Sequence, residues 1–164
     1  MKISKKIVLL GHFGVGKSSL IRRFVENTFT EDYKVTIGVH ILKKSVEIPQ
    51  EGKNVSLIIW DLEGNDDISA TRLSYLLGTN GFIYVFDVTR PSTYENLEAD
   101  LEFIKGKYKS VPVKVVGNKN DLVTKEFLKQ NNGKFGRLTN YYTSAKTGNN
   151  VEDLFNTLAI ELIK

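Results

Sequence analysis

The sequence predicts an α/β fold in which helices cover both faces of a mostly parallel sheet, giving three layers. Short apolar runs, typical of buried strands, alternate along the chain with segments of helical spacing. A glycine-rich loop joins the first apolar run to the first helical segment. Polar clusters directly follow four of the predicted strands, at the edge where ligands bind in such sheets.

The first half of the chain predicts a strand, a helix and an antiparallel hairpin, separated by polar loops. Pro49-Gln50-Glu51-Gly52-Lys53 has the composition of a turn and lies between two strand-like runs, which predicts the hairpin. The expected elements are a strand at 6–10, a helix at 17–26, a loop at 27–36, strands at 38–48 and 55–60, a loop at 61–67 and an amphipathic stretch at 68–77.

The second half alternates strands with helices. The run from Gly81 to Val88 is almost continuously apolar, which is typical of a strand covered on both faces. Ser92, with Glu95 three residues later, predicts an N-cap for a helix to about Tyr108. The other expected elements are strands at 111–116 and 138–143, a helix at 124–130, and a final helix that Asn150 caps and that has the apolar stripe Val151, Leu154, Phe155, Leu158 and Leu162.

Composition restricts the classes of function. The 164 residues suffice for one domain with a core, and no repeat or linker divides them. Because there is no cysteine, disulfides, thiolate metal sites, thiol nucleophiles and prenyl or palmitoyl attachment are excluded. No apolar run is long enough for a signal peptide or a membrane span. The net charge of +4 suits an anionic ligand, although a solvated basic face explains it more simply.

The first polar cluster is Gly11-His12-Phe13-Gly14-Val15-Gly16-Lys17-Ser18, which fits the GxxxxGK[ST] pattern of a phosphate-binding loop. Glycines let successive backbone N–H groups turn inward around an anion, and the following helix adds its positive end. Lys17 would reach the terminal phosphates and the Ser18 hydroxyl would bind Mg²⁺. An ordinary glycine-rich turn is the alternative, but both flanks fit the phosphate loop.

The other three clusters are individually weaker signals. Asp61 follows a strand and precedes Gly64 by three residues, so it could hold a Mg²⁺-bound water while the Gly64 N–H faces the last phosphate. In Asn118-Lys119-Asn120-Asp121, the Asp121 carboxylate could accept two N–H bonds from guanine, a pattern that adenine does not offer. Thr143-Ser144-Ala145-Lys146 follows the last strand. Alone, each could be an ordinary polar turn.

Together, in this order and on these elements, the four clusters resemble the Ras superfamily of small GTPases over essentially the whole chain. The similarity is greatest to the Rab group, in the segments Thr36-Ile37-Gly38-Val39, Ile58-Ile59-Trp60-Asp61, Phe86-Asp87-Val88-Thr89 and Thr143-Ser144-Ala145-Lys146-Thr147-Gly148. The resemblance implies a single G domain of the P-loop NTPase class over residues 1–164. That domain has a six-stranded, mostly parallel sheet with one antiparallel edge strand and about five helices.

The resemblance also implies a molecular switch that binds GTP or GDP with Mg²⁺, hydrolyses GTP and acts in signalling or vesicle trafficking. Ser18 and Thr36 would ligate Mg²⁺, with Asp61 behind a water. Phe29 would cover an edge of the guanine ring, and the Ala145 N–H would meet its oxygen; simple loop packing is the alternative for Phe29 and Tyr33. The implied catalytic residues are Lys17, Thr36, Gly64 and Asn65. The implied nucleotide contacts are Gly14, Val15, Gly16, Lys17, Ser18, Ser19, Phe29, Tyr33, Thr36, Gly64, Asn118, Lys119, Asp121, Ser144, Ala145 and Lys146.

Effectors, exchange factors and activating proteins would bind the two switch segments, residues 27–41 and 61–77, as the resemblance implies. We expect a monomer with no nucleic-acid partner and a cytoplasmic location. The chain ends at Lys164 without the lipid-modified tail usual in the family. Either that tail has been removed or the protein lacks it, in which case membrane attachment would come through partners or not occur.

Three residues near the expected γ-phosphate depart from the family pattern. Asn65 stands where Gln normally orients the attacking water, Phe13 where well-known members have Gly, and Glu63 where Ala is common. We therefore expect slow GTP hydrolysis, unless all three side chains face outward and matter little. One alternative is a GTP-binding module with little or no hydrolysis. Another is a small-molecule kinase, against which the absence of a basic lid segment argues.

Overall fold

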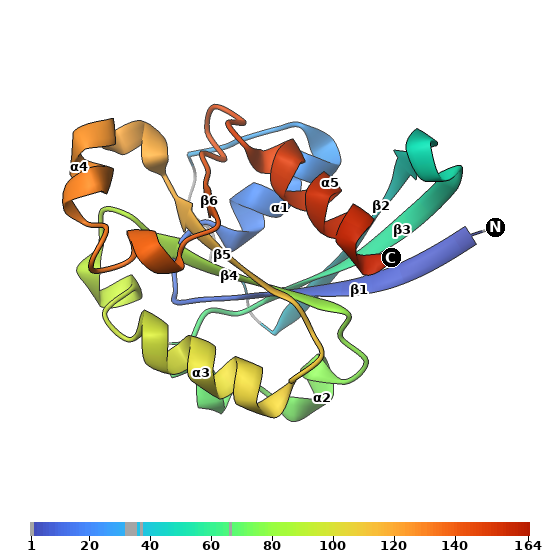
Figure 1. Ribbon diagram of the computed structural model, residues 1–164, viewed down its shortest axis with the longest axis horizontal. Coiled ribbons are helices and arrows are strands. Elements are labelled where there is room, and N and C mark those ends of the chain that lie inside the picture. Colours follow the sequence, from blue (N-terminus) through green and yellow to red (C-terminus); the bar gives the residue numbers. More distant parts are fainter. Residues whose placement is uncertain (1, 32–35, 37, 66) are drawn as a thin grey trace.

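The computed structural model describes residues 2–31, 36, 38–65 and 67–164. Within them, one sheet has the strand order β2-β3-β1-β4-β5-β6 (Figure 1). Only β2 is antiparallel to its neighbour, β3, whereas all other neighbouring pairs described are parallel. This confirms the predicted hairpin and mostly parallel sheet. The strands are β1 (Lys2–Leu10), β2 (Val39–Ile48), β3 (Lys53–Leu62), β4 (Gly81–Asp87), β5 (Val113–Asn118) and β6 (Tyr141–Tyr142).

Helices cover both faces of this sheet, as predicted (Figure 1). α1 and α5 pack on one face, where the Phe24 and Phe155 rings stack with centroids 4.3 Å apart. α2 and α3 cover the other face through Leu76, Leu97 and Leu101. The α-helices of the described chain are α1 (Lys17–Glu26), α2 (Leu73–Leu76), α3 (Leu97–Lys107), α4 (Lys125–Gln130) and α5 (Val151–Leu162).

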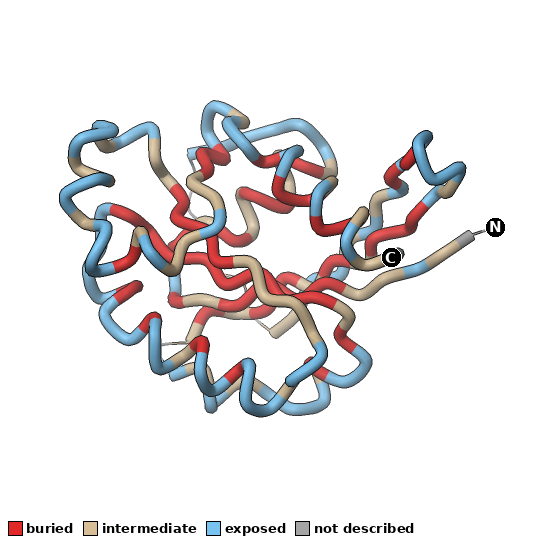
Figure 2. Tube along the Cα trace, viewed as in Figure 1, coloured by how far each residue is buried: buried red, intermediate tan, exposed pale blue. Residues whose placement is uncertain are grey.

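The core lies on the central strand β4, every residue of which is buried (Figure 2). Because side chains alternate across a strand, Ile83 and Val85 join the cluster under α1 and α5. Phe82, Tyr84 and Phe86 join the cluster under α2 and α3. The predicted strand covered on both faces is confirmed, and its rigid carboxyl end lies beside the phosphate loop.

Four details of the prediction need correction. The first strand begins at Lys2 rather than residue 6, because pairing with β3 starts at Lys2 and Asn54. Ser92 is no N-cap: it lies in a 3₁₀ turn, Pro91–Thr93, and α3 begins only at Leu97. The Thr93 hydroxyl stabilises this turn by accepting from the Asp87 N–H and donating to the Arg90 carbonyl.

The third correction concerns the last strand, which is only Tyr141–Tyr142 because residues Gly136–Leu138 form a 3₁₀ turn instead of pairing with β5. Fourth, Asn150 stands at the N-cap of α5 but does not cap it with its side chain. Its Nδ2 donates instead to the Tyr142 carbonyl at 2.8 Å. Leu162 is only partly buried, so the fully buried part of the apolar stripe on α5 ends one turn earlier, at Leu158.

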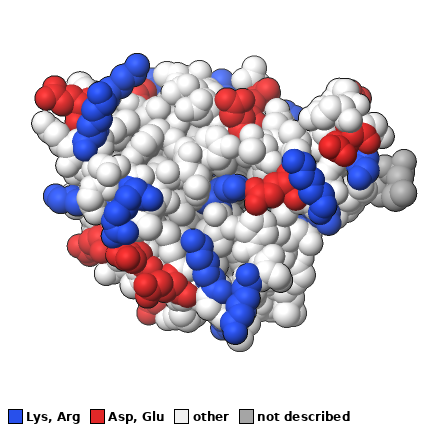
Figure 3. All heavy atoms as spheres, viewed as in Figure 1, with Lys and Arg blue, Asp and Glu red and all other residues white. Residues whose placement is uncertain are grey.

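The two ends of α3 carry opposite charge. Acidic residues gather over the start of α3 and basic residues over its end (Figure 3). Glu98 and Asp100 lie in its first turn and Lys105 and Lys107 in its last, which complements the helix dipole. No helix within the described ranges has the length and hydropathy that a membrane span requires.

Candidate nucleotide-binding site

A cavity of about 350 Å³ opens where the phosphate loop meets the loops after β3, β5 and β6. Most of the residues that the sequence assigned to nucleotide contact line it. Val15 and Ser144 lie beneath its surface, Asn65 lies outside the lining, and Tyr33 falls outside the described residues. The lining residues are Phe13, Gly14, Gly16, Lys17, Ser18, Ser19, Arg22, Phe29, Thr30, Glu31, Thr36, Leu62, Gly64, Asn118, Lys119, Asp121, Leu122, Ala145 and Lys146.

The first two carbonyls of the phosphate loop are bound by the loop's own lysine. Lys17 Nζ donates to the Gly11 and His12 carbonyl oxygens at 3.1 and 3.0 Å. Lys17 is only 6% exposed. Burial lowers its pKa to about 8, although the nearby Asp61 carboxylate opposes this shift. An ammonium held in this way favours an anion beside it, because phosphate would compensate for the lost water.

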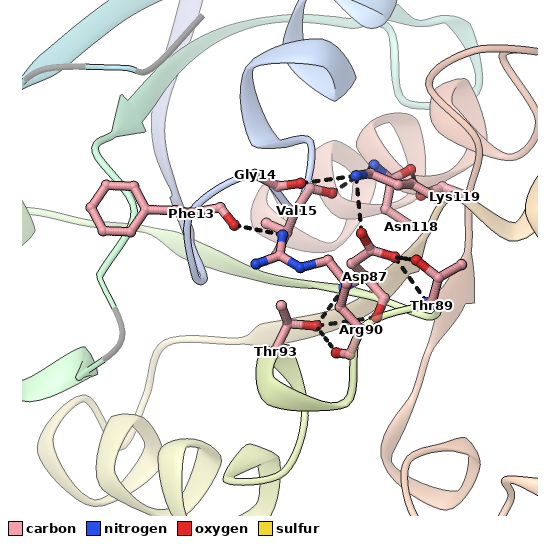
Figure 4. Close-up of polar contacts among 10 residues, drawn as sticks. Phe13, Gly14, Val15, Asp87, Thr89, Arg90, Thr93, Asn118 and Lys119 are labelled. Atoms are coloured by element: carbon pink, nitrogen blue, oxygen red, sulfur yellow. Dashed lines mark hydrogen bonds and ion pairs between the residues drawn. The ribbon is translucent and has the colours of Figure 1, made fainter. Parts of the chain in front are cut away.

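The next three carbonyls are bound by side chains from other loops (Figure 4). Arg90 donates to the Phe13 carbonyl at 2.8 Å, Lys119 to Gly14 at 2.9 Å, and Asn118 Nδ2 to Val15 at 3.0 Å. Side-chain donors thus engage every carbonyl from residue 11 to residue 15. With these carbonyls engaged, the loop can present its N–H groups to an anion.

Close contact between two loops explains the last glycine of the phosphate loop. Gly16 has φ +99°, in the left-handed region, and a Cβ there would collide with Asn118 Nδ2. Asn118 is itself 1% exposed, and its Oδ1 accepts from Thr143 Oγ1 at 3.0 Å. The phosphate loop, β5 and the loop after β6 are therefore tied together through one buried amide.

Three oxygen donors converge at the start of α1. Ser18 Oγ lies 2.8 Å from Thr36 Oγ1 and donates to Asp61 Oδ2 at 2.5 Å. Asp61 is 3% exposed, and its Oδ1 has no hydrogen-bond partner within the part of the chain that the structure describes. Burial raises the pKa of Asp61, against the opposing effects of Ser18 and Lys17. Hard oxygen donors with an unpaired carboxylate oxygen fit Mg²⁺.

The opposite end of the cavity carries a carboxylate that is fixed by a neighbouring loop. Ser144 Oγ donates to Asp121 Oδ1 at 2.8 Å and accepts from the Thr147 N–H at 3.1 Å. Asp121 lines the cavity. A fixed carboxylate beside a buried amide can read the N–H edge of a purine.

Comparison with known proteins agrees with this geometry. Residues 6–164 match the model of the Ras family. The chain is also 38% identical to the "Ras-related protein Rab-1A" of Dictyostelium discoideum over 162 residues, which cover 96% of this chain and 79% of that protein.

The chain belongs to the Ras family. It is accordingly a Rab-like small GTPase, a GTP-binding switch of a family that acts on guanine nucleotides, generally with Mg²⁺, and works with regulators and effectors.

Sequence reasoning assigned no role to Asp87, although it quoted this residue in a Rab-like segment. Asp87 is 1% exposed, and its Oδ2 lies 2.9 Å from Lys119 Nζ (Figure 4). Its Oδ1 accepts from the Thr89 N–H at 2.9 Å and from Thr89 Oγ1 at 2.6 Å. The Asp-x-Thr spacing signals this turn, but only the fold reveals the pairing with Lys119.

Backbone contacts join the loop after β3 to the phosphate loop at one side of this cavity. A Cβ on Gly64 would lie 2.6 Å from the Phe13 nitrogen, so only glycine fits there. The flanking Glu63 and Asn65 N–H groups donate to the Gly38 and Gly11 carbonyls at 2.9 and 3.2 Å. The loop after β3 therefore lies directly on the phosphate loop.

The three departures from the family pattern do not lie together. Phe13 is 42% exposed at the cavity rim, and its ring points away from Arg90 (Figure 4). Asn65 and Glu63 instead line a separate, water-sized cavity of about 10 Å³, together with Tyr84 and other residues. In this arrangement the amide that the resemblance makes catalytic stands apart from the nucleotide cavity.

Proposed function

We propose that this protein is a guanine-nucleotide switch that binds GTP or GDP with Mg²⁺ in the cavity described above and hydrolyses GTP slowly. The observation that carries the proposal is the phosphate loop, whose five successive carbonyls are held by side chains beside a buried lysine. Such a loop offers N–H groups and one ammonium to a polyphosphate.

Each end of the cavity supports one part of the role. Lys17 with the N–H groups of residues 14–16 would bind the phosphates, and Ser18, Thr36 and Asp61 would hold Mg²⁺. Bound Mg²⁺ neutralises charge on the β- and γ-phosphate oxygens. The base-side contacts would come from Phe29, Asn118, Lys119, Asp121, Ser144, Ala145 and Lys146, with Ser19 toward the phosphates.

The slow rate follows from the residues near the γ-phosphate. The Asn65 side chain is one methylene shorter than the Gln usual in the family. It lines the small cavity beside Tyr84 and not the cavity in which we propose that the nucleotide binds. We therefore expect hydrolysis at or below the order of 10⁻⁴ s⁻¹, the scale of unassisted family members. Phe13 at the rim would also hinder an arginine supplied by an activating protein.

We further propose a single domain over residues 1–164 that acts as a monomer. Residues 27–41 and 61–77 would be the surfaces for effectors, exchange factors and activating proteins, with Thr36 and Gly64 as the points that release on γ-phosphate loss. Ile41, Leu73 and Leu77 are more than half exposed and supply apolar contact area. Membrane association, in Rab-like trafficking, would come through partners.

A second candidate is a binding module that holds GTP without useful hydrolysis. The separation of Asn65 from the cavity lining favours it. Purified protein, precipitated with acid, would release its nucleotide for chromatography and mass analysis. We expect about one GDP per chain in magnesium buffer. Mostly GTP would favour the binding module, whereas failure to retain or rebind either nucleotide would refute the whole proposal.

A further inference from the structure

Arg23 joins the first helix to the loop that precedes α5, although no motif includes it. Its Nε donates to the Ala145 carbonyl at 2.8 Å and its Nη2 to the Lys146 carbonyl at 2.6 Å. This loop passes beside the carboxyl end of α1 (Figure 1). One planar guanidinium therefore binds two successive carbonyls through two different nitrogens, which fixes the orientation of the side chain relative to the loop.

The arginine is fixed on its own side as well. Its Nη1 lies 3.3 Å from Asn27 Oδ1, and the Asn27 N–H donates to the Arg23 carbonyl at 3.1 Å. Gly148 lies directly over the side-chain stem, since a Cβ there would be 3.6 Å from Arg23 Cδ. The side chain is half-buried, so its hydrogen bonds are partly shielded from water.

Fixing the Ala145 carbonyl also fixes the N–H on the same peptide. In a trans peptide the carbonyl and the following N–H point in opposite directions. The Ala145 carbonyl is drawn toward α1, so the Lys146 N–H points away from α1, and Ala145 and Lys146 both line the cavity. Neither the Ala145 nor the Lys146 N–H has an acceptor among the residues that the structure describes.

Ala145 is only 4% exposed, and buried N–H groups are nearly always paired. The unpaired, buried N–H of Ala145 on the cavity wall therefore favours an acceptor on the ligand, and the N–H of the more exposed Lys146 lies next to it. The carboxylate of Asp121, which Ser144 fixes, would read the neighbouring N–H edge of the same base.

We infer that Arg23 is a specificity-positioning residue, which holds the Ala145–Lys146 peptide so that the N–H groups of Ala145 and Lys146 meet the 6-oxygen of guanine. The inference rests on the proposed guanine-nucleotide function. Arg23 touches no ligand itself; it acts through the loop that it binds. Its removal should therefore weaken recognition of the 6-oxygen and leave the phosphate contacts intact.

The test compares two diphosphates that differ at the base. GDP carries the 6-oxygen, whereas 2,6-diaminopurine riboside diphosphate carries an amino group there and cannot accept those N–H bonds. The variant Arg23→Met keeps an apolar stem but removes all donors. Competition against a fluorescent nucleotide in magnesium buffer would give both affinities, and thermal unfolding would monitor the fold.

We expect Arg23→Met to lower the affinity for GDP about fivefold to tenfold, which is the scale of a lost hydrogen bond. The affinity for the diaminopurine analogue should fall less than twofold. The ratio of the two affinities should fall accordingly. Arg23→Lys keeps the charge but replaces the planar pair of donors with a single ammonium nitrogen, so its effect on the affinity ratio should be intermediate. Lys44→Met is the matched control. Lys44 Nζ also donates to a carbonyl of α1, that of Phe24, but its bond does not involve the loop that contains Ala145 and Lys146.

An equal loss for both ligands would overturn the inference, because it would show a merely structural role. An unchanged ratio in both Arg23→Met and Arg23→Lys would also overturn it, and Arg23→Lys decides the question if Arg23→Met does not fold. If the unmodified protein bound neither diphosphate, or did not prefer GDP, the proposed function itself would fail, which is a distinguishable result.

Discussion

The two ends of the nucleotide cavity are built differently. At the base end, side chains bind the backbone of neighbouring loops: Arg23 binds two carbonyls, Asn118 and Lys119 bind the phosphate loop, and Ser144 fixes Asp121. At the end where we propose that the γ-phosphate binds (the γ-phosphate end), the loop after β3 contacts the phosphate loop through a backbone hydrogen bond and the close packing of Gly64 on Phe13.

This difference separates recognition from response. These side-chain bonds between neighbouring loops keep the base end in one arrangement, so the ligand need not order it on binding. At the γ-phosphate end, the backbone N–H groups of Glu63 and Asn65 are held only by backbone carbonyls. An incoming phosphate can therefore replace these hydrogen bonds at a small cost in free energy. The base end should therefore govern affinity and selectivity, and the γ-phosphate end should govern the switch and turnover.

The largest effect should come from breaking the base end at Asp121. Asp121→Asn replaces an acceptor with a donor, so GDP affinity should fall about 100-fold or more, while xanthosine diphosphate should gain. Competition binding with both diphosphates measures this. Glu126→Gln removes an exposed carboxylate in the next helix and should change neither affinity. Unaltered GDP binding in Asp121→Asn would mean that the base assignment is wrong.

A smaller loss of GDP binding should follow from removing the ion pair that holds Lys119. Asp87→Asn removes the buried carboxylate partner of Lys119 and should speed GDP release about tenfold, since the half-buried Lys119 ammonium loses its counter-ion beside the base. Stopped-flow displacement of fluorescent GDP measures the rate. Glu98→Gln, which breaks the exposed pair with Arg137, is the control and should have little effect. Wild-type release from Asp87→Asn would show that this ion pair does not support the base end.

At the γ-phosphate end, the expected change is in turnover rather than affinity. Asn65→Gln lengthens the amide side chain and should raise single-turnover GTP hydrolysis about threefold to tenfold. Phe13→Gly should add to this effect, and GDP affinity should stay within about twofold of the wild type. Ser69→Ala, in the same segment, serves as control. Fast hydrolysis by the unmodified protein would contradict the proposed slow rate.

The smallest effect is a proton taken up on binding. In the empty protein burial holds the Lys17 pKa at about 8, and a bound diphosphate should raise that pKa. Above pH 8 the Lys17 side chain is mainly neutral in the protein without nucleotide and charged in the complex with GDP. GDP binding therefore takes up a proton, and GDP affinity falls as the pH rises. Near pH 8.5 the uptake should be about 0.7 proton.

Isothermal titration calorimetry in two buffers of different ionisation enthalpy measures this uptake. The number of protons taken up per GDP bound should rise between pH 7.5 and pH 8.5. A binding enthalpy that does not depend on the buffer at pH 8.5 would show that Lys17 stays charged in the empty protein.

The layered sheet and the phosphate loop could be predicted from the residue pattern alone. Strand and helix periodicity report burial directly, and GxxxxGK[ST] is a contiguous pattern, so residues 11–18 could be assigned without tertiary information. Local signals were less reliable where tertiary contacts compete. Ser92 has the spacing of a capping box, yet Pro91–Thr93 forms a 3₁₀ turn because Thr93 binds the backbone of Asp87 and Arg90.

The distant side chains that support the site became evident only from the folded chain. Arg23 and Ala145 are 122 residues apart, and Asn118 and Val15 are 103 apart, so no local pattern could pair them. The fold also placed Asn65 with Tyr84 in a separate small cavity. The reason is physical: periodicity records whether a residue is buried, whereas hydrogen-bond partners depend on which loops the sheet brings to one edge.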